Sequence, residues 1–431
     1  MPNFKVFCIF FIVPWSVYAQ NHVTIEDCIR AATINHSLYK QNSIIHQIDI
    51  YEHKNISKTY LPHLRLVAEA SYQSDVTELY ISNPNLPFDI QTPTLSKDHY
   101  SAYLEASQLL WNGGISSAQK KIIEKKSAME KIQIEIQLYD VQKEVMQLYF
   151  NILATDAYIS LLRIAEDNLA QNRITVQSQL HNGIAMESDL YLIDVELLEI
   201  DKKKIEHIAL KNSYIHALES YTQFDLISNA TFTIPKVDFI PTHSINRAEL
   251  NYFDAKSTLY TLQKKERQAM NNPSIHLFLN AGYGRPALNF LDDNFNLYGI
   301  VGLRFSWNLW NMYTQHNAMQ ILDLKQQSVR LYKDDFIFKT TVALSKEEAE
   351  IYAVQERIAK EQEIVALRAK IREQSESRHK HGVYKTNELI RDIHAEHEAM
   401  QQQEFLLLQY TMKVYVYNFM QNQHSTENTK P

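Results

Sequence analysis

The sequence predicts a mainly α-helical chain with a small transmembrane β part. Three observations support this fold class. Residues 115–182 and 311–381 contain neither Gly nor Pro, the segments ahead of them alternate apolar and polar residues, and the two halves share motifs at a constant offset of 199. A strand hairpin followed by a long coiled-coil helical hairpin is therefore expected twice.

The first 19 residues are expected to form a cleaved signal peptide. Lys5 precedes the apolar run 6–13, and Ala19 ends a stretch with the spacing of a signal-peptidase site, so the mature chain should begin at Gln20. Eight apolar residues are too few to anchor the chain, because a spanning helix needs roughly 20. Cys8 leaves with this peptide, and Cys28 alone cannot form an intrachain disulfide.

The remaining composition narrows the function classes. Beyond residue 20 the chain has no uninterrupted apolar stretch near 18 residues, so we expect no transmembrane helix, and entry into a membrane would require a β-barrel. A net charge of −7 with interspersed acids and bases gives no case for nucleic-acid binding. We find no catalytic constellation and no cofactor motif, which predicts a protein that is not an enzyme.

The two segments free of Gly and Pro are predicted to be very long helices. Apolar residues recur in them at helical spacing, for example at Val141, Val145 and Leu148. A helix of about 68 residues would reach roughly 100 Å. A lone helix of that length cannot bury its apolar stripe, so we expect coiled-coil packing against neighbours.

An internal repeat sets the domain boundaries. Trp111 matches Trp310, and Gly183 matches Gly382, at the same offset of 199. We assign residues 20–228 to the first repeat, 229–243 to a linker, 244–420 to the second repeat and 421–431 to a tail. Each repeat should hold a helix, two strands and a long helical hairpin.

The strand segments alternate with a period of two. Leu64, Leu66, Ala68 and Ala70 illustrate the pattern, and each segment has about ten residues, the length of a tilted transmembrane strand. A soluble hairpin with one buried face would show the same alternation. Four strands cannot close a membrane barrel, whose smallest forms have about eight, so the membrane interpretation requires an oligomer.

Several motifs together resemble the TolC family of outer-membrane efflux channels over nearly the whole mature chain. They are Asn35 to Leu38 opening a helix, Pro62 and Pro273 starting strands, the Leu-Trp-Asn-Gly-Gly junction at 110–114, the Arg-Ala-Glu at 247–249, and two glycine turns each followed by an acid six residues later. The chain departs from the family pattern at Met312 and Tyr313, which replace junction glycines, and at Arg391, which replaces an acid.

The resemblance implies a homotrimer in which a β-barrel in outer-membrane lipid continues into an α-helical barrel. It also implies docking onto a periplasmic adaptor, or membrane fusion protein, linked to an inner-membrane pump. The expected location is the outer membrane of a double-membrane bacterium, with a long periplasmic portion. Some relatives carry a lipid on a cysteine at the cleavage point, where this chain has Gln20, so we expect no lipid anchor.

The candidate sites lie at the glycine turns. We expect the turns to contact the adaptor, through Gly183, Ile184, Ala185, Gly382, Val383 and Tyr384. Asp189, Glu388 and Arg391 are candidates for a periplasmic gate. The two acids could equally stabilise the N-terminus of a helix, where a carboxylate meets the positive end of the dipole. His394 and His397 lie three residues apart, a spacing that suits a shared metal or a solvated helical face, and two nitrogens alone fall short of a zinc site.

The leading function is a passive exit duct in a tripartite efflux or type I secretion system. The alternative is an exported coiled-coil scaffold or adhesin without channel activity, in which the strands would form a soluble cap.

Overall fold

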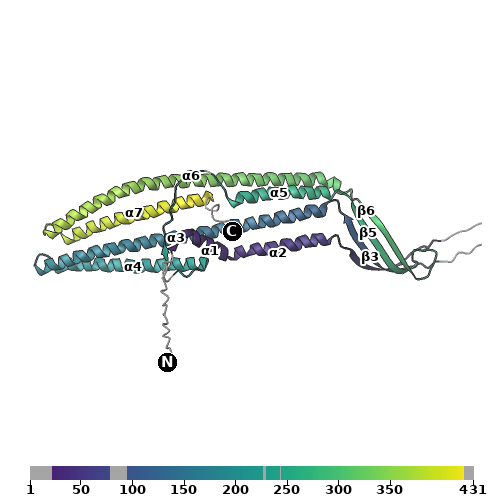
Figure 1. Cartoon of the computed structure of the whole chain (residues 1–431), viewed down its shortest axis with the longest axis horizontal. Coiled ribbons are helices and arrows are strands. Elements are labelled where there is room, and N and C mark those ends of the chain that lie inside the picture. Colours follow the sequence, from purple (N-terminus) through teal and green to yellow (C-terminus); the bar gives the residue numbers. More distant parts are fainter. Residues whose placement is uncertain (1–21, 78–94, 227–229, 243, 422–431) are drawn as a thin grey trace, which may run out of the picture. The chain divides into compact units, whose positions relative to one another are not determined.

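The computed structural model describes residues 22–77, 95–226, 230–242 and 244–421 (Figure 1). The predicted signal peptide lies outside the described residues. Two short strands and one helix have no counterpart in the other half: β1 (His22–Val23), α1 (Ile25–Asn35) and β4 (Thr231–Phe232). The first repeat then contains α2 (Ser37–Lys58), β2 (His63–Tyr72), β3 (Asp98–Trp111), α3 (Ile115–His181) and α4 (Glu187–Thr222). The second contains α5 (Ala248–Ala269), β5 (Ser274–Arg285), β6 (Asn296–Ser306), α6 (Asn311–Lys380) and α7 (Thr386–Gln421).

This element order confirms the predicted fold class, a duplicated strand hairpin joined to a long helical hairpin. Helix α3 has 67 residues and α6 has 70, so the absence of Gly and Pro in these segments marks two very long helices. Helices α4 and α7 both have 36 residues and begin and end at positions that differ by 199. The offset found in the sequence motifs is therefore the offset of the structural repeat.

Two compact units divide the chain in a way that cuts across the repeats. Of the described residues, those within 22–40, 137–247 and 338–421 form unit 1, and those within 41–136 and 248–337 form unit 2. Helices α3 and α6 each contribute residues to both units. Each repeat therefore supplies part of each unit.

Unit 2 contains a sheet of four antiparallel strands in the order β2-β3-β5-β6. Its central pair joins the two repeats, with Leu104 of β3 opposite Ala281 of β5. Strands β2 and β6 are the outermost strands of the described sheet. Helix α5 of this unit is tied to α6 by hydrogen bonds from Lys264 Nζ to Asp323 and, at 2.6 Å, to Gln326 Oε1.

Unit 1 is held by apolar clusters between the helices of both hairpins. The largest contains Tyr149 and Ile152 of α3, Leu218 of α4 and Tyr415 of α7, with Cys28 of α1 also fully buried. The Tyr149 hydroxyl lies 2.8 Å from the carbonyl of Val23 and accepts a 3.0 Å bond from the amide of Thr233. It thereby fastens the parallel pair β1–β4 to α3, and burial raises the pKa of Tyr149 to about 12.

One described helix, α3, is long and apolar enough to cross a membrane by length and composition, contrary to the expectation from the sequence. Half of its most apolar window is buried. The same helix supplies Val145, Tyr149 and Ile152 to the core of unit 1. Packing between helices accounts for this apolar content.

Candidate functional site

The sheet of unit 2 has one apolar face, which we call the outward face. Paired residues of antiparallel strands share a face, so the register assigns each side chain. The outward face carries, from β2 to β6, Leu64, Leu66, Ala68, Ala70, Tyr72, Asp98, Tyr100, Ala102, Leu104, Ala106, Gln108, Trp111, Ile275, Leu277, Leu279, Ala281, Tyr283, Arg285, Leu297, Gly299, Val301, Leu303 and Phe305. Its polar members, Asp98, Gln108 and Arg285, lie near the ends of their strands. Leu66, Leu297 and Val301 are each more than 70% exposed.

The opposite face of the sheet is polar. Glu105 of β3 accepts hydrogen bonds from Arg65 of β2, at 3.1 Å from Nε and 2.5 Å from Nη2. Arg304 of β6 brings its Nη1 to 3.9 Å from the other carboxylate oxygen. Glu105 is buried, whereas both arginines remain mostly exposed. This face can therefore lie against water while the outward face cannot do so without cost.

The helical hairpins of unit 1 reverse at two matched glycine turns. Gly183 has φ +71° and Gly382 has φ +73°, a left-handed conformation that residues with a side chain rarely adopt. The amides of Gly183 and Ile184 donate to the carbonyls of Leu180 and Gln179 at 3.0 and 2.9 Å. The second turn repeats this pattern from Gly382 and Val383, at 2.9 and 3.1 Å. In both α3 and α6, the turn therefore satisfies two carbonyls of the last helical turn.

The six predicted contact residues divide into exposed and packed positions. Ile184 is 66% and Val383 79% exposed, and both glycines are exposed beside them. Ala185 packs against the cluster of Val176, Ile193 and Ile390, and Tyr384 packs against the cluster around Leu389. The two turns lie close together, because a Cβ placed on Gly382 would be 4.0 Å from Ile184 Cγ2.

Behind the turns, buried polar groups join the helices. Asp392 is 9% exposed, and its carboxylate accepts hydrogen bonds from Ser375 Oγ at 2.6 Å and from the Tyr384 hydroxyl at 2.8 Å. Arg372 of α6 forms ion pairs with Glu396 of α7 and, at 2.8 Å, with Glu376 of its own helix. These bonds fix α6 and α7 to each other close to their turn.

Comparison with solved structures identifies the fold. Neither a scan of protein-family models nor a search of curated protein sequences gives a match. The structure of CusC has a TM-score of 0.67 at 14% identity, covering 97% of this chain and 98% of that chain. The outer-membrane protein VceC from Vibrio cholerae has a TM-score of 0.62 at 14% identity, covering 92% of this chain and 95% of that chain. The CmeC outer-membrane channel from Campylobacter jejuni has a TM-score of 0.62 at 14% identity, with 97% and 93% covered.

The chain has the TolC-like fold. The resemblance inferred from the motifs is thus confirmed as a likeness of fold.

Within this TolC-like fold, the two predicted gate acids lie in the first turn of α4 and of α7. The Asp189 carboxylate accepts a 3.0 Å hydrogen bond from the amide of Met186, and Glu388 lies 3.4 Å from the amide of Lys385. These are helix-capping contacts, in which an acid satisfies an amide that has no partner within the helix. Both acids therefore cap helices in this chain. Their role in a periplasmic gate remains a prediction.

Arg391, the third gate candidate, has a side chain that is 72% exposed and lies 4.0 Å from Asp392 Oδ1. Arg391 follows Glu388 by three residues on the same helix, a spacing at which the two side chains could pair. In the structure Arg391 lies next to Asp392 instead. The other oxygen of that carboxylate already accepts hydrogen bonds from Ser375 and Tyr384. A role for Arg391 between chains remains a prediction.

His394 and His397 face the first helical hairpin rather than each other. His394 Nε2 lies 2.9 Å from Glu196 Oε2 of α4. His397 Nε2 lies 3.3 Å from the side-chain Nδ2 of Asn168 of α3. A fully solvated helical face is therefore wrong for His397. Burial, together with the charges of His394 and Arg372, lowers the pKa of His397 to about 4. Among the described residues no three His, Cys, Asp or Glu side chains gather into a group that could hold a metal ion.

Sequence reasoning missed Arg372, Asp392 and Glu396. One signal was present, because Asp392 and Glu396 lie one helical turn apart next to the apolar positions Leu389 and Ile393, where a solvated face would not be expected. His379, close to the second glycine turn, is also buried: it is 5% exposed, and its Nε2 lies 3.2 Å from Thr386 Oγ1. Burial lowers the pKa of His379, and the charge of Asp189 opposes this.

Proposed function

We propose that this chain is a subunit of an outer-membrane channel, the passive exit duct of a tripartite efflux or type I secretion system. The observation that carries the proposal is the outward face of the sheet, where four strands expose a continuous band of apolar side chains. A band of this kind is costly in water and favourable in hydrocarbon.

A homotrimer is the assembly that makes this sheet into a duct. The outermost strands β2 and β6 carry backbone groups that need partners in a membrane. Two copies would give eight strands, and a barrel of that size is filled by its own side chains. Three copies would give twelve strands and leave a lumen, lined by the polar face that carries Arg65, Glu105 and Arg304.

Exposed apolar stripes on the helices support the same assembly. On α4, Tyr191, Leu198 and Ile205 recur every seven residues and are 59 to 70% exposed. On α6, Leu324 and Leu331 have the same spacing and are 60 and 69% exposed. Seven-residue spacing is that of coiled-coil seams, so neighbouring copies are the natural partners of these stripes.

The glycine turns would dock onto a periplasmic adaptor linked to an inner-membrane pump. Ile184 and Val383 supply an exposed apolar surface on turns whose backbone is fixed by hydrogen bonds. A photocrosslinking residue at Val383 should capture an adaptor in cells, and one at Glu361, further back from the turn on α6, serves as the control. Equal capture at both positions would contradict docking through the turns.

The decisive test of the channel is made on the purified mature chain. Light scattering in detergent should give the mass of three chains, and insertion into planar bilayers should give discrete conductance steps. A stable folded monomer that gives no conductance would overturn the proposal. Recovery of the protein from cells in the soluble fraction would favour a scaffold or adhesin.

A further inference from the structure

The loop between β5 and β6, residues 286–295, carries an apolar tip. Leu288 is 55%, Phe290 57% and Leu291 44% exposed, and Asp292 and Asp293 follow directly. Connecting loops in water are usually polar, and single exposed apolar residues need no explanation. Three within four positions, next to two acids, form an amphipathic tip that can contact an apolar surface.

Phe295 fastens this loop to one side of the sheet. Its ring stacks on Tyr283 of β5, with centroids 5.4 Å apart and ring planes at 22°. The same ring lies 6.3 Å from Tyr100 of β3. Tyr283 pairs with Ala102 and Leu297, and Tyr100 pairs with Ala70, so both tyrosines belong to the outward face. The loop is therefore attached to the apolar side of the sheet rather than the polar side.

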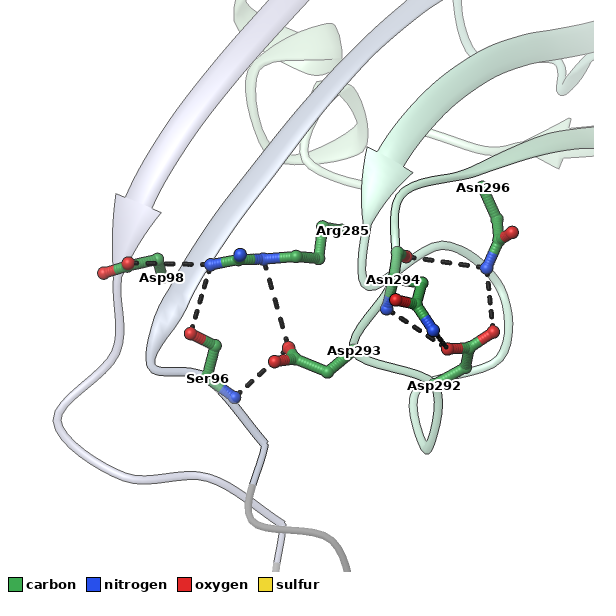
Figure 2. Close-up of polar contacts among 7 residues, drawn as sticks. All are labelled: Ser96, Asp98, Arg285, Asp292, Asp293, Asn294 and Asn296. Carbon is green, nitrogen blue, oxygen red and sulfur yellow. Dashed lines mark hydrogen bonds and ion pairs between the residues drawn. The ribbon is translucent and has the colours of Figure 1, made fainter.

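Arg285 adds polar contacts that hold the loop in the same place (Figure 2). Its guanidinium lies over the rings of Tyr100 and Phe295, at 5.6 and 5.4 Å. Its Nη2 donates to Ser96 Oγ at 3.1 Å, and Asp293 accepts a 3.2 Å bond from the amide of Ser96. These contacts hold the loop and the end of β5 together on the outward face.

We propose that the tip formed by Leu288, Phe290 and Leu291 inserts into the boundary between headgroups and acyl chains of the membrane that surrounds the sheet. This inference rests on the proposed function, which places lipid against the outward face. Aromatic and long aliphatic side chains beside charged groups are the composition that such a boundary favours. The apolar surface of the strands at Tyr283 and Leu297 continues into the loop, so one lipid layer would cover both.

The test uses nitroxide labels on single cysteines in the purified trimer, reconstituted in phosphatidylcholine vesicles. Cys28 is fully buried and Cys8 precedes the expected cleavage site, so an introduced cysteine takes the label. Leu303→Cys on the outward face and Glu69→Cys on the polar face give the lipid and water references. For a label at Phe290→Cys we expect more collisions with oxygen than with a water-soluble nickel chelate, by severalfold. The ratio of the two collision rates should fall between those of the lipid and water references. Adding Phe295→Ala should release the loop and restore collisions with nickel.

The outcomes separate this inference from the proposed function. If Leu303→Cys behaves as lipid-exposed and Phe290→Cys collides with nickel as freely as Glu69→Cys, the loop lies in water and only the inference is overturned. A label at Phe290 that is shielded from both reagents would mean that a second copy of the chain covers the tip, which also overturns it. A label at Leu303 that is open to nickel would overturn the proposed function together with the inference.

Discussion

The hydroxyl of Tyr384 donates a 2.8 Å hydrogen bond to the carboxylate of Asp392, which connects the second glycine turn to the first two turns of α7. Ser375 of α6 donates to the same oxygen at 2.6 Å. Asp392 is 9% exposed, so these two hydroxyl groups replace much of the water that a buried carboxylate would otherwise lose. Asp392 therefore links α6, the second glycine turn and α7 through one carboxylate.

Removing either donor should loosen this end of the hairpin. A hydrogen bond to a charged group contributes about 1.5–3 kcal/mol, so Tyr384→Phe or Ser375→Ala should lower protection of the α7 amides from hydrogen exchange about tenfold to a hundredfold. Ser377→Ala, at an exposed position one half-turn further on, serves as the control. Unchanged exchange in both variants would show that water substitutes for the hydroxyl groups without cost.

Replacing the glycine of either turn should destabilise the turn, because both glycines have positive φ. Gly183→Ala has open space around its new methyl group, so its cost is that of positive φ alone, about 1–2 kcal/mol. Gly183→Pro also loses the 3.0 Å bond to Leu180, and we expect it to impair export while the trimer still forms. Gly382→Asp should act in the same way. Drug or metal susceptibility of cells measures export. Normal export in both the Gly183→Pro and the Gly382→Asp variants would contradict the assignment of the turns as the docking end.

Much of this fold can be predicted from the sequence, because the positions of Gly and Pro set where the long helices begin and end. The absence of Gly and Pro marks α3 and α6, and the matched glycines mark where they end. The parallel pair β1–β4 was not predicted, because its two-residue strands depend on Tyr149 of a distant helix. The contacts of Asp392 and His397 were missed for a similar reason, since helical spacing gives the face of a residue but not its partner on another hairpin.

Acid should weaken the packing of α7 against α3. Because the neutral imidazole of His397 is favoured in the folded chain, the stability it contributes is complete above its ordinary pKa of 6.5 and falls as the pH drops from 6.5 towards about 4. His397→Gln keeps a hydrogen-bonding group for Asn168 and removes the titration. Thermal unfolding followed by circular dichroism from pH 8 to pH 4 should therefore show a smaller loss of stability in this variant. An identical pH profile in parent and variant would contradict the role of His397.

A charge in the apolar stripe of α6 should weaken the trimer without unfolding the chain. Leu331 is 69% exposed in the single chain, so Leu331→Glu disturbs no core packing. In a coiled-coil seam the carboxylate would lose water, and dissociation should occur at a lower temperature in detergent. Arg330→Glu serves as the control: it changes the net charge more than Leu331→Glu does, at a neighbouring exposed position outside the stripe. It should have little effect on the dissociation temperature. Equal dissociation temperatures for parent and Leu331→Glu, measured by gel mobility after heating, would remove α6 from the interface.

The last prediction concerns Arg391, whose side chain is 72% exposed beside the Asp392 carboxylate. Within one chain such an exposed contact contributes only a few tenths of a kcal/mol. In a trimer the same arginine would occur three times around the axis, where it could bridge to Asp189 or Glu388 of a neighbouring copy and hold the periplasmic end closed. We therefore expect Arg391→Ser to raise single-channel conductance in planar bilayers and to make cells more permeable to large antibiotics. The difference should shrink at high salt, because screening weakens the same pairs in the parent. Lys380→Ser, which removes an exposed charge at the end of α6, controls for a general change in surface charge. If the folded Arg391→Ser trimer conducts like the parent at low salt, Arg391 has no gating role and its acid neighbours serve only as helix caps.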